Sequence, residues 1–157
     1  MNFRLATFFV SILVSIAASG GAHASGSFTL DAKCSEDYAT VGDTTAGKLH
    51  CGVDISTSDG APFVEGHSGR VAGFVNVRQG DGDSFRLDAL MELRFPGGVL
   101  YGHAYRDSGV LHRGEGQLRM IGADGEFAGI EATCTYTVRQ GESLLIVHNC
   151  VWRRLGR

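Results

Sequence analysis

Apolar and polar residues alternate with a period of two through most of the chain after residue 26. The clearest case is segment 84–95, in which every second residue from Phe85 to Phe95 is apolar and most residues between them are charged. Successive side chains of a strand point to opposite faces, whereas a helix would scatter these charges around its circumference. The segment therefore predicts a strand with one buried face and one solvated face.

The same pattern predicts about eight strands, joined by short polar or glycine-rich turns. They cover residues 27–34, 48–56, 70–78, 84–95, 99–106, 109–121, 130–139 and 144–153. The polar segment 35–46 is predicted to be a loop. There are 23 glycines, two prolines and no helical period, which predicts an all-β protein. Hairpins that follow one another without a long crossover favour an eight-stranded antiparallel up-and-down barrel over a sandwich, with a small interior cavity.

The N-terminal residues have the features of a secretory signal peptide. Residues 1–24 contain one early positive charge, a run of apolar residues and an A-x-A sequence at 22–24. A membrane anchor is the alternative, but the apolar run is short for a bilayer. We therefore expect cleavage after Ala24, a single barrel domain over residues 25–157, no membrane insertion after cleavage, and a secreted or periplasmic location.

Net charge and cysteine content bear on three questions: a nucleic-acid partner, disulfide bonds and a metal site. The formal net charge of −3 gives no reason to expect a nucleic-acid partner. Four cysteines in an exported chain predict two disulfides, and the pairing Cys34–Cys51 and Cys134–Cys150 needs only local loops. A zinc site is the alternative, but no C-x-x-C spacing is present, so we expect no metal.

The lengths of two turns predict which side chains face the interior. A three-residue turn at 96–98 and a two-residue turn at 107–108 would place His103 opposite His112 inside the barrel. In this register Tyr101 and Tyr105 flank the pair, and Met91 faces His103. In the last hairpin, Tyr136 would face His148, next to the Cys134–Cys150 pair. A slip of one residue would send every one of these side chains to the opposite face.

These residues form the candidate interior site. Imidazole and phenol groups can donate and accept protons near neutral pH, and Gly114 and Gly116 on the same face would leave room beside them. Ordinary packing of a polar core is the alternative. The candidate cavity residues are Met91, Tyr101, His103, Tyr105, His112, Tyr136 and His148.

A glycine-rich stretch near the C-terminal end resembles a known family. The matching residues are Gly122, Ala123, Gly125, Phe127, Ala128, Gly129 and Ile130. They are similar to a turn in the allene oxide cyclase and dirigent barrel superfamily, although Ala123 replaces a usual glycine. The resemblance implies an eight-stranded barrel with an apolar cavity, often trimeric, that handles ligands by cyclisation, coupling control or binding. The motif is structural, so it transfers no catalytic residue.

Three functional hypotheses follow from the sequence. The first is an exported barrel that binds a small apolar molecule in its interior and leaves it unchanged. The second is a cofactor-free isomerase or cyclase that acts in the same cavity. The third is a structural or protein-interaction barrel, with homo-oligomerisation as the resemblance implies. The sequence does not decide between binding and catalysis, and we expect no cofactor.

Overall fold

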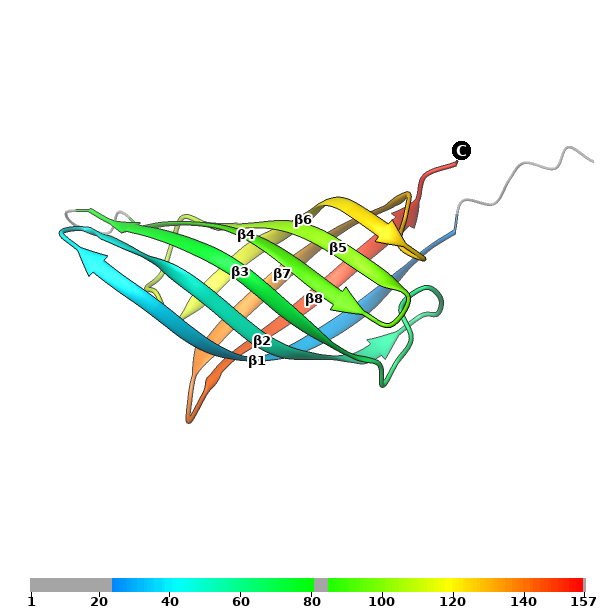
Figure 1. Ribbon diagram of the computed structural model, residues 1–157, viewed down its shortest axis with the longest axis horizontal. Coiled ribbons are helices and arrows are strands. Elements are labelled where there is room, and N and C mark those ends of the chain that lie inside the picture. Colours follow the sequence, from blue (N-terminus) through cyan, green and yellow to red (C-terminus); the bar gives the residue numbers. More distant parts are fainter. Residues whose placement is uncertain (1–23, 81–84, 157) are drawn as a thin grey trace, which may run out of the picture.

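The chain forms a closed barrel in which every strand pairs antiparallel with its neighbours in sequence and the last strand pairs with the first. The computed structural model describes residues 24–80 and 85–156. The strands are β1 (Ser25–Val41), β2 (Thr44–Ser58), β3 (Ser68–Gln79), β4 (Phe85–Phe95), β5 (Gly98–Arg106), β6 (Gly114–Gly125), β7 (Ile130–Gln140) and β8 (Leu144–Arg154). The predicted eight-stranded up-and-down barrel is confirmed (Figure 1). Residues 1–23 of the predicted signal peptide lie outside the described residues, so that segment stays a prediction.

The predicted loop at 35–46 was wrong, because β1 and β2 continue through it. β1 runs to Val41 and β2 begins at Thr44, so that only a tight turn joins them. Tyr38 pairs with Gly47 across these strands, and a Cβ at Gly47 would overlap Tyr38. The absence of a side chain at Gly47 therefore lets the Tyr38 ring lie over the neighbouring strand.

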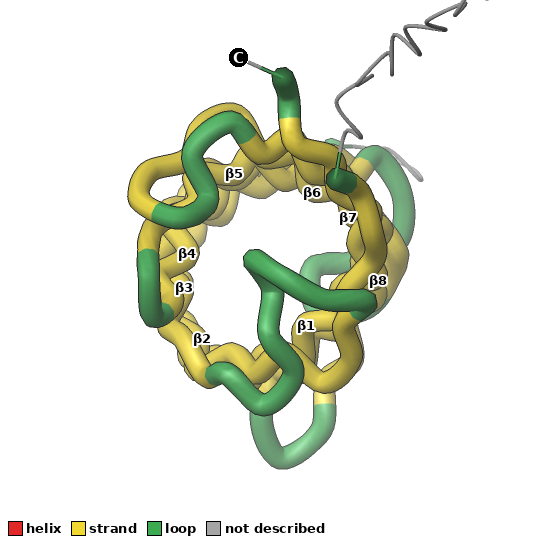
Figure 2. Tube along the Cα trace, turned by 90° about the vertical axis from the view of Figure 1, so that its right-hand side faces the viewer, coloured by secondary structure: helices red, strands yellow, loops and turns green. Residues whose placement is uncertain are grey.

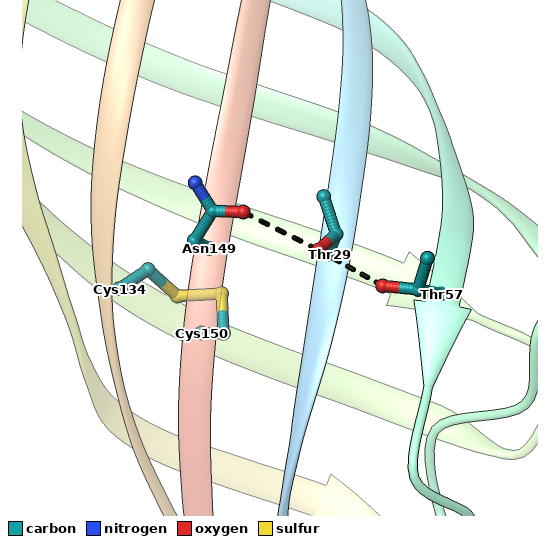
Figure 3. The surroundings of a disulfide bond; sticks show 5 residues. All are labelled: Thr29, Thr57, Cys134, Asn149 and Cys150. Carbon is teal, nitrogen blue, oxygen red and sulfur yellow. Dashed lines mark hydrogen bonds between the residues drawn. A yellow bond between two sulfur atoms is a disulfide. The ribbon is translucent and has the colours of Figure 1, made fainter.

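Two disulfides join neighbouring strands on the inner face of the barrel. Cys34 and Cys51 are direct cross-strand partners and are bonded, as are Cys134 and Cys150. The predicted pairing is confirmed. Figure 3 shows the Cys134–Cys150 bond between β7 and β8, and hydrogen bonds that run from Thr57 to Thr29 and from Thr29 to Asn149 across β2, β1 and β8. The disulfides thus reinforce the hairpins on both sides of the β1–β8 seam where the barrel closes, and the Thr29–Asn149 hydrogen bond crosses the seam itself.

Aromatic side chains close one end of the barrel, which we call the plugged end. The loop between β2 and β3 lies across this opening (Figure 2) and buries Phe63 completely. The Phe63 ring stacks on Phe28 at 3.7 Å between centroids and also packs against Phe127 and Trp152. The two chain termini of the barrel lie at this end. Any interior space therefore lies toward the opposite end, which holds the β1–β2, β5–β6 and β7–β8 turns and which we call the hairpin end.

In the described part of the chain, no helix has the length and apolar character that crossing a membrane requires.

Candidate functional site

An apolar cavity of about 50 Å³ lies inside the barrel toward the hairpin end. A water molecule needs roughly 10–15 Å³ of such space, so the cavity has room for about four waters or an organic molecule of about six to eight non-hydrogen atoms. The lining residues come from β1, β2, β3, β4, β5, β7, β8 and the β5–β6 loop. They are Glu36, Tyr38, Leu49, Val75, Leu87, Ala89, Met91, Ala104, Leu111, Tyr136, Val138, Leu144, Ile146 and His148.

Tyr136 and His148 place two polar groups in this apolar wall. They are direct cross-strand partners on β7 and β8, and their ring centroids are 5.6 Å apart. Both side chains are buried. Burial raises the pKa of the Tyr136 phenol to about 12, although the nearby Arg106 guanidinium acts in the opposite direction. The phenol is therefore protonated at neutral pH, and its hydroxyl donates a long hydrogen bond of 3.5 Å to the carbonyl oxygen of Tyr105.

Gly116 provides the space that the Tyr136 ring occupies. The two residues are paired between β6 and β7, and a Cβ at Gly116 would overlap the Tyr136 ring. Gly114 has the same relation to Arg106, since a Cβ there would lie 3.0 Å from Nη1. The prediction that these two glycines leave an empty space was wrong, because larger side chains fill it.

His148 is held neutral inside the barrel. Burial lowers the pKa of its imidazole to about 4, while Asp31 and a hydrogen bond with the Leu30 backbone act in the opposite direction. Nδ1 of His148 is buried and has no hydrogen-bond partner among the described residues. A neutral imidazole offers one donor and one acceptor, which suits hydrogen bonding to an uncharged ligand group or proton exchange with it.

The buried imidazole predicts a loss of stability in mild acid. The folded-state pKa lies below the unfolded value of about 6.5, so the unfolded chain takes up a proton first as the pH falls. Stability contributed by neutral His148 is complete above about pH 6.5 and is lost as the pH falls toward 4, by about 3 kcal/mol. Urea unfolding at pH 7 and pH 4 should show this loss in the wild type. The His148→Gln variant should lose about 3 kcal/mol less than the wild type between pH 7 and pH 4. The matched variant at the exposed His50, His50→Gln, should lose as much stability as the wild type.

The β5–β6 loop, residues 107–113, covers the hairpin end of the cavity through two anchored contacts. Nη2 of Arg106 donates hydrogen bonds to the carbonyl oxygens of Val110 and Leu111 at 2.7 and 2.8 Å. Nε2 of His112 lies 2.9 Å from Oε2 of Glu36 on β1. Between these contacts the Leu111 side chain lines the cavity. A ligand entering from this end would have to pass the loop.

The predicted interior position of Tyr101, His103 and Tyr105 was wrong. The turn after β4 contains two residues and not three, so Phe95 pairs with Gly98. Gly97 has a φ of 92°, which suits the third position of a Pro-Gly turn. The one-residue shift sends all three side chains to the outer face of β5, while the other face of that strand is buried.

The outward side chains of β5 contribute to an external groove of about 730 Å³. There Nε2 of His103 lies 3.3 Å from Oδ1 of Asp88, and the Tyr105 hydroxyl donates to Oε1 of Gln117 at 2.8 Å. The pKa of Asp88 is lower than usual, mainly because Arg86 hydrogen-bonds to its carboxylate, and His103 contributes less to this shift. The groove is half-open and bordered by exposed charged side chains that pair with one another. Its geometry is that of a solvated outer wall.

The predicted His103–His112 pair does not form. His103 lies on the outer face of β5, while His112 lies in the β5–β6 loop at the mouth of the cavity. The expected turn at 107–108 is a longer loop, and β6 begins only at Gly114. Of the predicted cavity residues, Met91, Tyr136 and His148 line the interior space.

Sequence reasoning missed four residues that line the cavity, Glu36, Tyr38, Ala104 and Leu111, and their neighbour Arg106. Glu36 lay in the segment predicted as a loop, and Leu111 in a predicted strand. In the predicted register, in which Tyr105 faces inward, Arg106 falls on the outer face, and the high cost of burying an unpaired charge favours the same position. The two-residue Pro-Gly turn at 96–97 was the available signal, because it places Leu100, Ala104 and Arg106 on the inner face.

Within the described ranges, no group of three or more histidine, cysteine, aspartate or glutamate side chains is arranged to hold a metal ion. Glu36 and His148 line the cavity, and Glu36 pairs with His112 of the β5–β6 loop.

No family model matches the sequence, and a search of curated proteins finds no match. The fold, however, is similar to that of several solved structures. One is a non-specific heme-binding cyclase that catalyses a 4+2 cycloaddition in neoabyssomicin biosynthesis, with a TM-score of 0.64 and 15% identity over 88% of this chain and 70% of that chain.

Two further structures share the fold. Pyocyanin demethylase has a TM-score of 0.53 and 14% identity, and the match covers 79% of this chain and 98% of that one. The Diels–Alderase AbmU from Streptomyces koyangensis has a TM-score of 0.52 and 14% identity over 88% of this chain and 72% of that one. At these identities the likeness establishes a common barrel fold, which two of these proteins use for cyclisation.

Proposed function

We propose that this protein binds a small, mainly apolar molecule inside the barrel, between Tyr136 and the β5–β6 loop. The observation that carries the proposal is an apolar cavity in which His148 has a buried ring nitrogen without a protein partner in the described chain. Buried polar atoms are normally satisfied, and ligand sites are typically apolar with a few converging polar groups. The solved barrels of similar fold are named for heme binding, cyclisation and demethylation of small molecules, which agrees with this use of the interior.

The size of the cavity limits what it can hold. Drug-sized ligands occupy sites of about 300–1000 Å³, which is well above the space found here. With the β5–β6 loop in its present position, the site suits a molecule of about six to eight non-hydrogen atoms. A larger ligand requires the loop to move away from Glu36 and to release the two carbonyl groups that Arg106 holds.

The binding proposal can be tested with hexanamide as a neutral probe of matching size. We expect wild-type protein to bind it, as measured by calorimetry or by shifts of backbone NMR signals around Tyr136 and His148. Ala104→Leu fills the cavity and should weaken binding at least tenfold, whereas Ala72→Leu adds the same atoms on the outer face and should leave it unchanged. No binding to the wild type, or equal binding by the two variants, would count against an interior site.

A cofactor-free cyclase or isomerase is the second candidate. It is favoured by the two cyclases of similar fold and by the sequence resemblance to the allene oxide cyclase and dirigent superfamily. In this case Tyr136 would donate a hydrogen bond, neutral His148 would exchange a proton, and the apolar wall would hold a flexible substrate in its reactive shape. The outward position of His103 removes that side chain from the catalytic set.

We also propose that the protein is exported from the cytoplasm. Two disulfides on the inner face suit an oxidising compartment, and the sequence of residues 1–24 resembles a signal peptide. A secreted or periplasmic barrel would meet small molecules from outside the cell. Assembly into a homo-oligomer remains part of what the family resemblance implies.

A further inference from the structure

Arg106 is the most deeply buried charged residue of the described chain, with 2% of its surface exposed. It lies on the inner face at the end of β5, opposite Leu87 of β4. Its guanidinium carbon sits 4.8 Å from the centre of the Phe85 ring, which is a cation–π contact. The chain thus places a permanent positive charge inside a mainly apolar barrel.

The described residues provide no negative charge for this guanidinium. None of the ion pairs among them involves Arg106. Nη2 is satisfied by the two loop carbonyls, but Nε and Nη1 are buried and have no hydrogen-bond partner in the described chain. Burial lowers the pKa of Arg106, yet an arginine side chain stays protonated under all ordinary conditions. Removing such a charge from water is costly unless another charge compensates it.

Arg106 is not itself one of the residues that line the cavity, but it lies directly beside it. Three residues that line the cavity are its immediate neighbours: Leu87 is its cross-strand partner, Ala104 lies two residues earlier on the same face, and Leu111 accepts one of its hydrogen bonds. Tyr136 is close enough for the charge to act on its phenol. The one acidic residue in the cavity wall, Glu36, is engaged with His112.

We propose that the interior site is selective for small organic anions, whose carboxylate or enolate oxygen is bound by Arg106 while the apolar part occupies the cavity. The inference rests on the proposed function, because it names the ligand class of the same site. Nε and Nη1 supply hydrogen-bond donors, and the Tyr136 hydroxyl supplies another if it leaves its long hydrogen bond to the Tyr105 carbonyl oxygen. The same charge excludes cationic amines, and the cavity volume limits the apolar part to a chain or ring of about six atoms.

Hexanoate and hexanamide test this selectivity because they share shape and size and differ in charge. A charge-assisted hydrogen bond outweighs a neutral one, so hexanoate should bind the wild-type protein about 10-fold to 100-fold more tightly than hexanamide at neutral pH. Hexylamine should not bind. Titration with hexanoate should also shift the Nε–H signal of Arg106 in ¹⁵N NMR spectra, which places the anion at this side chain.

Variants at Arg106 complete the experiment. Arg106→Gln should remove the preference for hexanoate over hexanamide, and Arg106→Lys, which keeps the charge, should restore part of it. Since Arg106 also anchors the loop, each variant is first checked for a wild-type circular dichroism spectrum. If a variant does not fold, the comparison of ligands and the Arg106 signal in the wild type still decide the question.

The outcomes separate this inference from the proposed function. Equal binding of hexanoate and hexanamide, or an unchanged Arg106 Nε–H signal in the hexanoate complex, overturns anion selectivity and leaves the interior site in place. Absence of binding by both probes overturns the interior site and its anion selectivity together. Tighter binding of hexanoate with a shifted Arg106 signal supports both.

Discussion

Phe63→Ala should destabilise the protein by about 3–5 kcal/mol, the range found when a buried phenylalanine is truncated. The Phe63 side chain is completely buried although it belongs to a loop, and it contacts three other aromatic rings. Its removal leaves a cavity between β1, β8 and the β6–β7 turn, whose backbone positions are fixed by strand pairing. Urea denaturation followed by the fluorescence of Trp152, the one tryptophan in the sequence, measures the loss directly.

The neighbouring residue provides a matched control. Val64 lies in the same loop, but 42% of its surface is exposed. Val64→Ala should therefore change stability by less than about 0.5 kcal/mol. Similar losses for the two variants would mean that the loop stabilises the barrel as a whole segment. A near-neutral Phe63→Ala would show that the aromatic plug is not required to close this end.

The last hairpin shows what the sequence could predict well. A four-residue turn at 140–143 would set Arg139 opposite Leu144, but the Cys134–Cys150 pairing requires a register one residue away, which also sets Tyr136 opposite His148. The structure has this pairing. Gln140 pairs with Leu144, so the turn has three residues, and the cysteine spacing was the signal that gave the correct register. The two residues that face each other, Tyr136 and His148, form the polar part of the cavity wall.

The β4–β5 hairpin shows why the candidate site was only partly predictable. β5 carries a tyrosine, a histidine and another tyrosine on one face and small or apolar residues on the other, so both faces were compatible with burial. The difference of one residue in the turn therefore decided the inner face. The charge of Arg106 then favoured the wrong choice, because the rule that charges face water has its exceptions at functional sites.

Close contacts between distant segments explain the remaining differences. The burial of Phe63 depends on β1, β8 and the β6–β7 turn meeting at one end of the barrel. Similarly, Gly114 and Gly116 are required by the size of Arg106 and Tyr136 on neighbouring strands. Local alternation cannot reveal such contacts, since it specifies which face is buried but not what fills the interior.

The two disulfides divide the stabilisation of the barrel between its N-terminal and C-terminal hairpins. Each closes a loop of similar length, with sequence separations of 17 and 16 residues, and each should stabilise the fold by about 3 kcal/mol through restriction of the unfolded chain. Cys34 pairs with Leu144 on β8, six residues before Cys150, which places the bonds about 20 Å apart along that strand. At that distance their effects should add.

Replacing all four cysteines by alanine should therefore cost about 6 kcal/mol, and either pair alone about half of that. Because a domain of this size has a stability of about 5–15 kcal/mol, the fourfold variant should lose at least about two-fifths of its stability. Urea denaturation of the wild type with and without reductant measures the same difference without mutation, and the fourfold variant, which has no thiol, should be insensitive to reductant. An unfolding midpoint of the wild type that reductant leaves unchanged would contradict the prediction. A large shift would mean that the barrel depends on an oxidising compartment, as the proposed export requires.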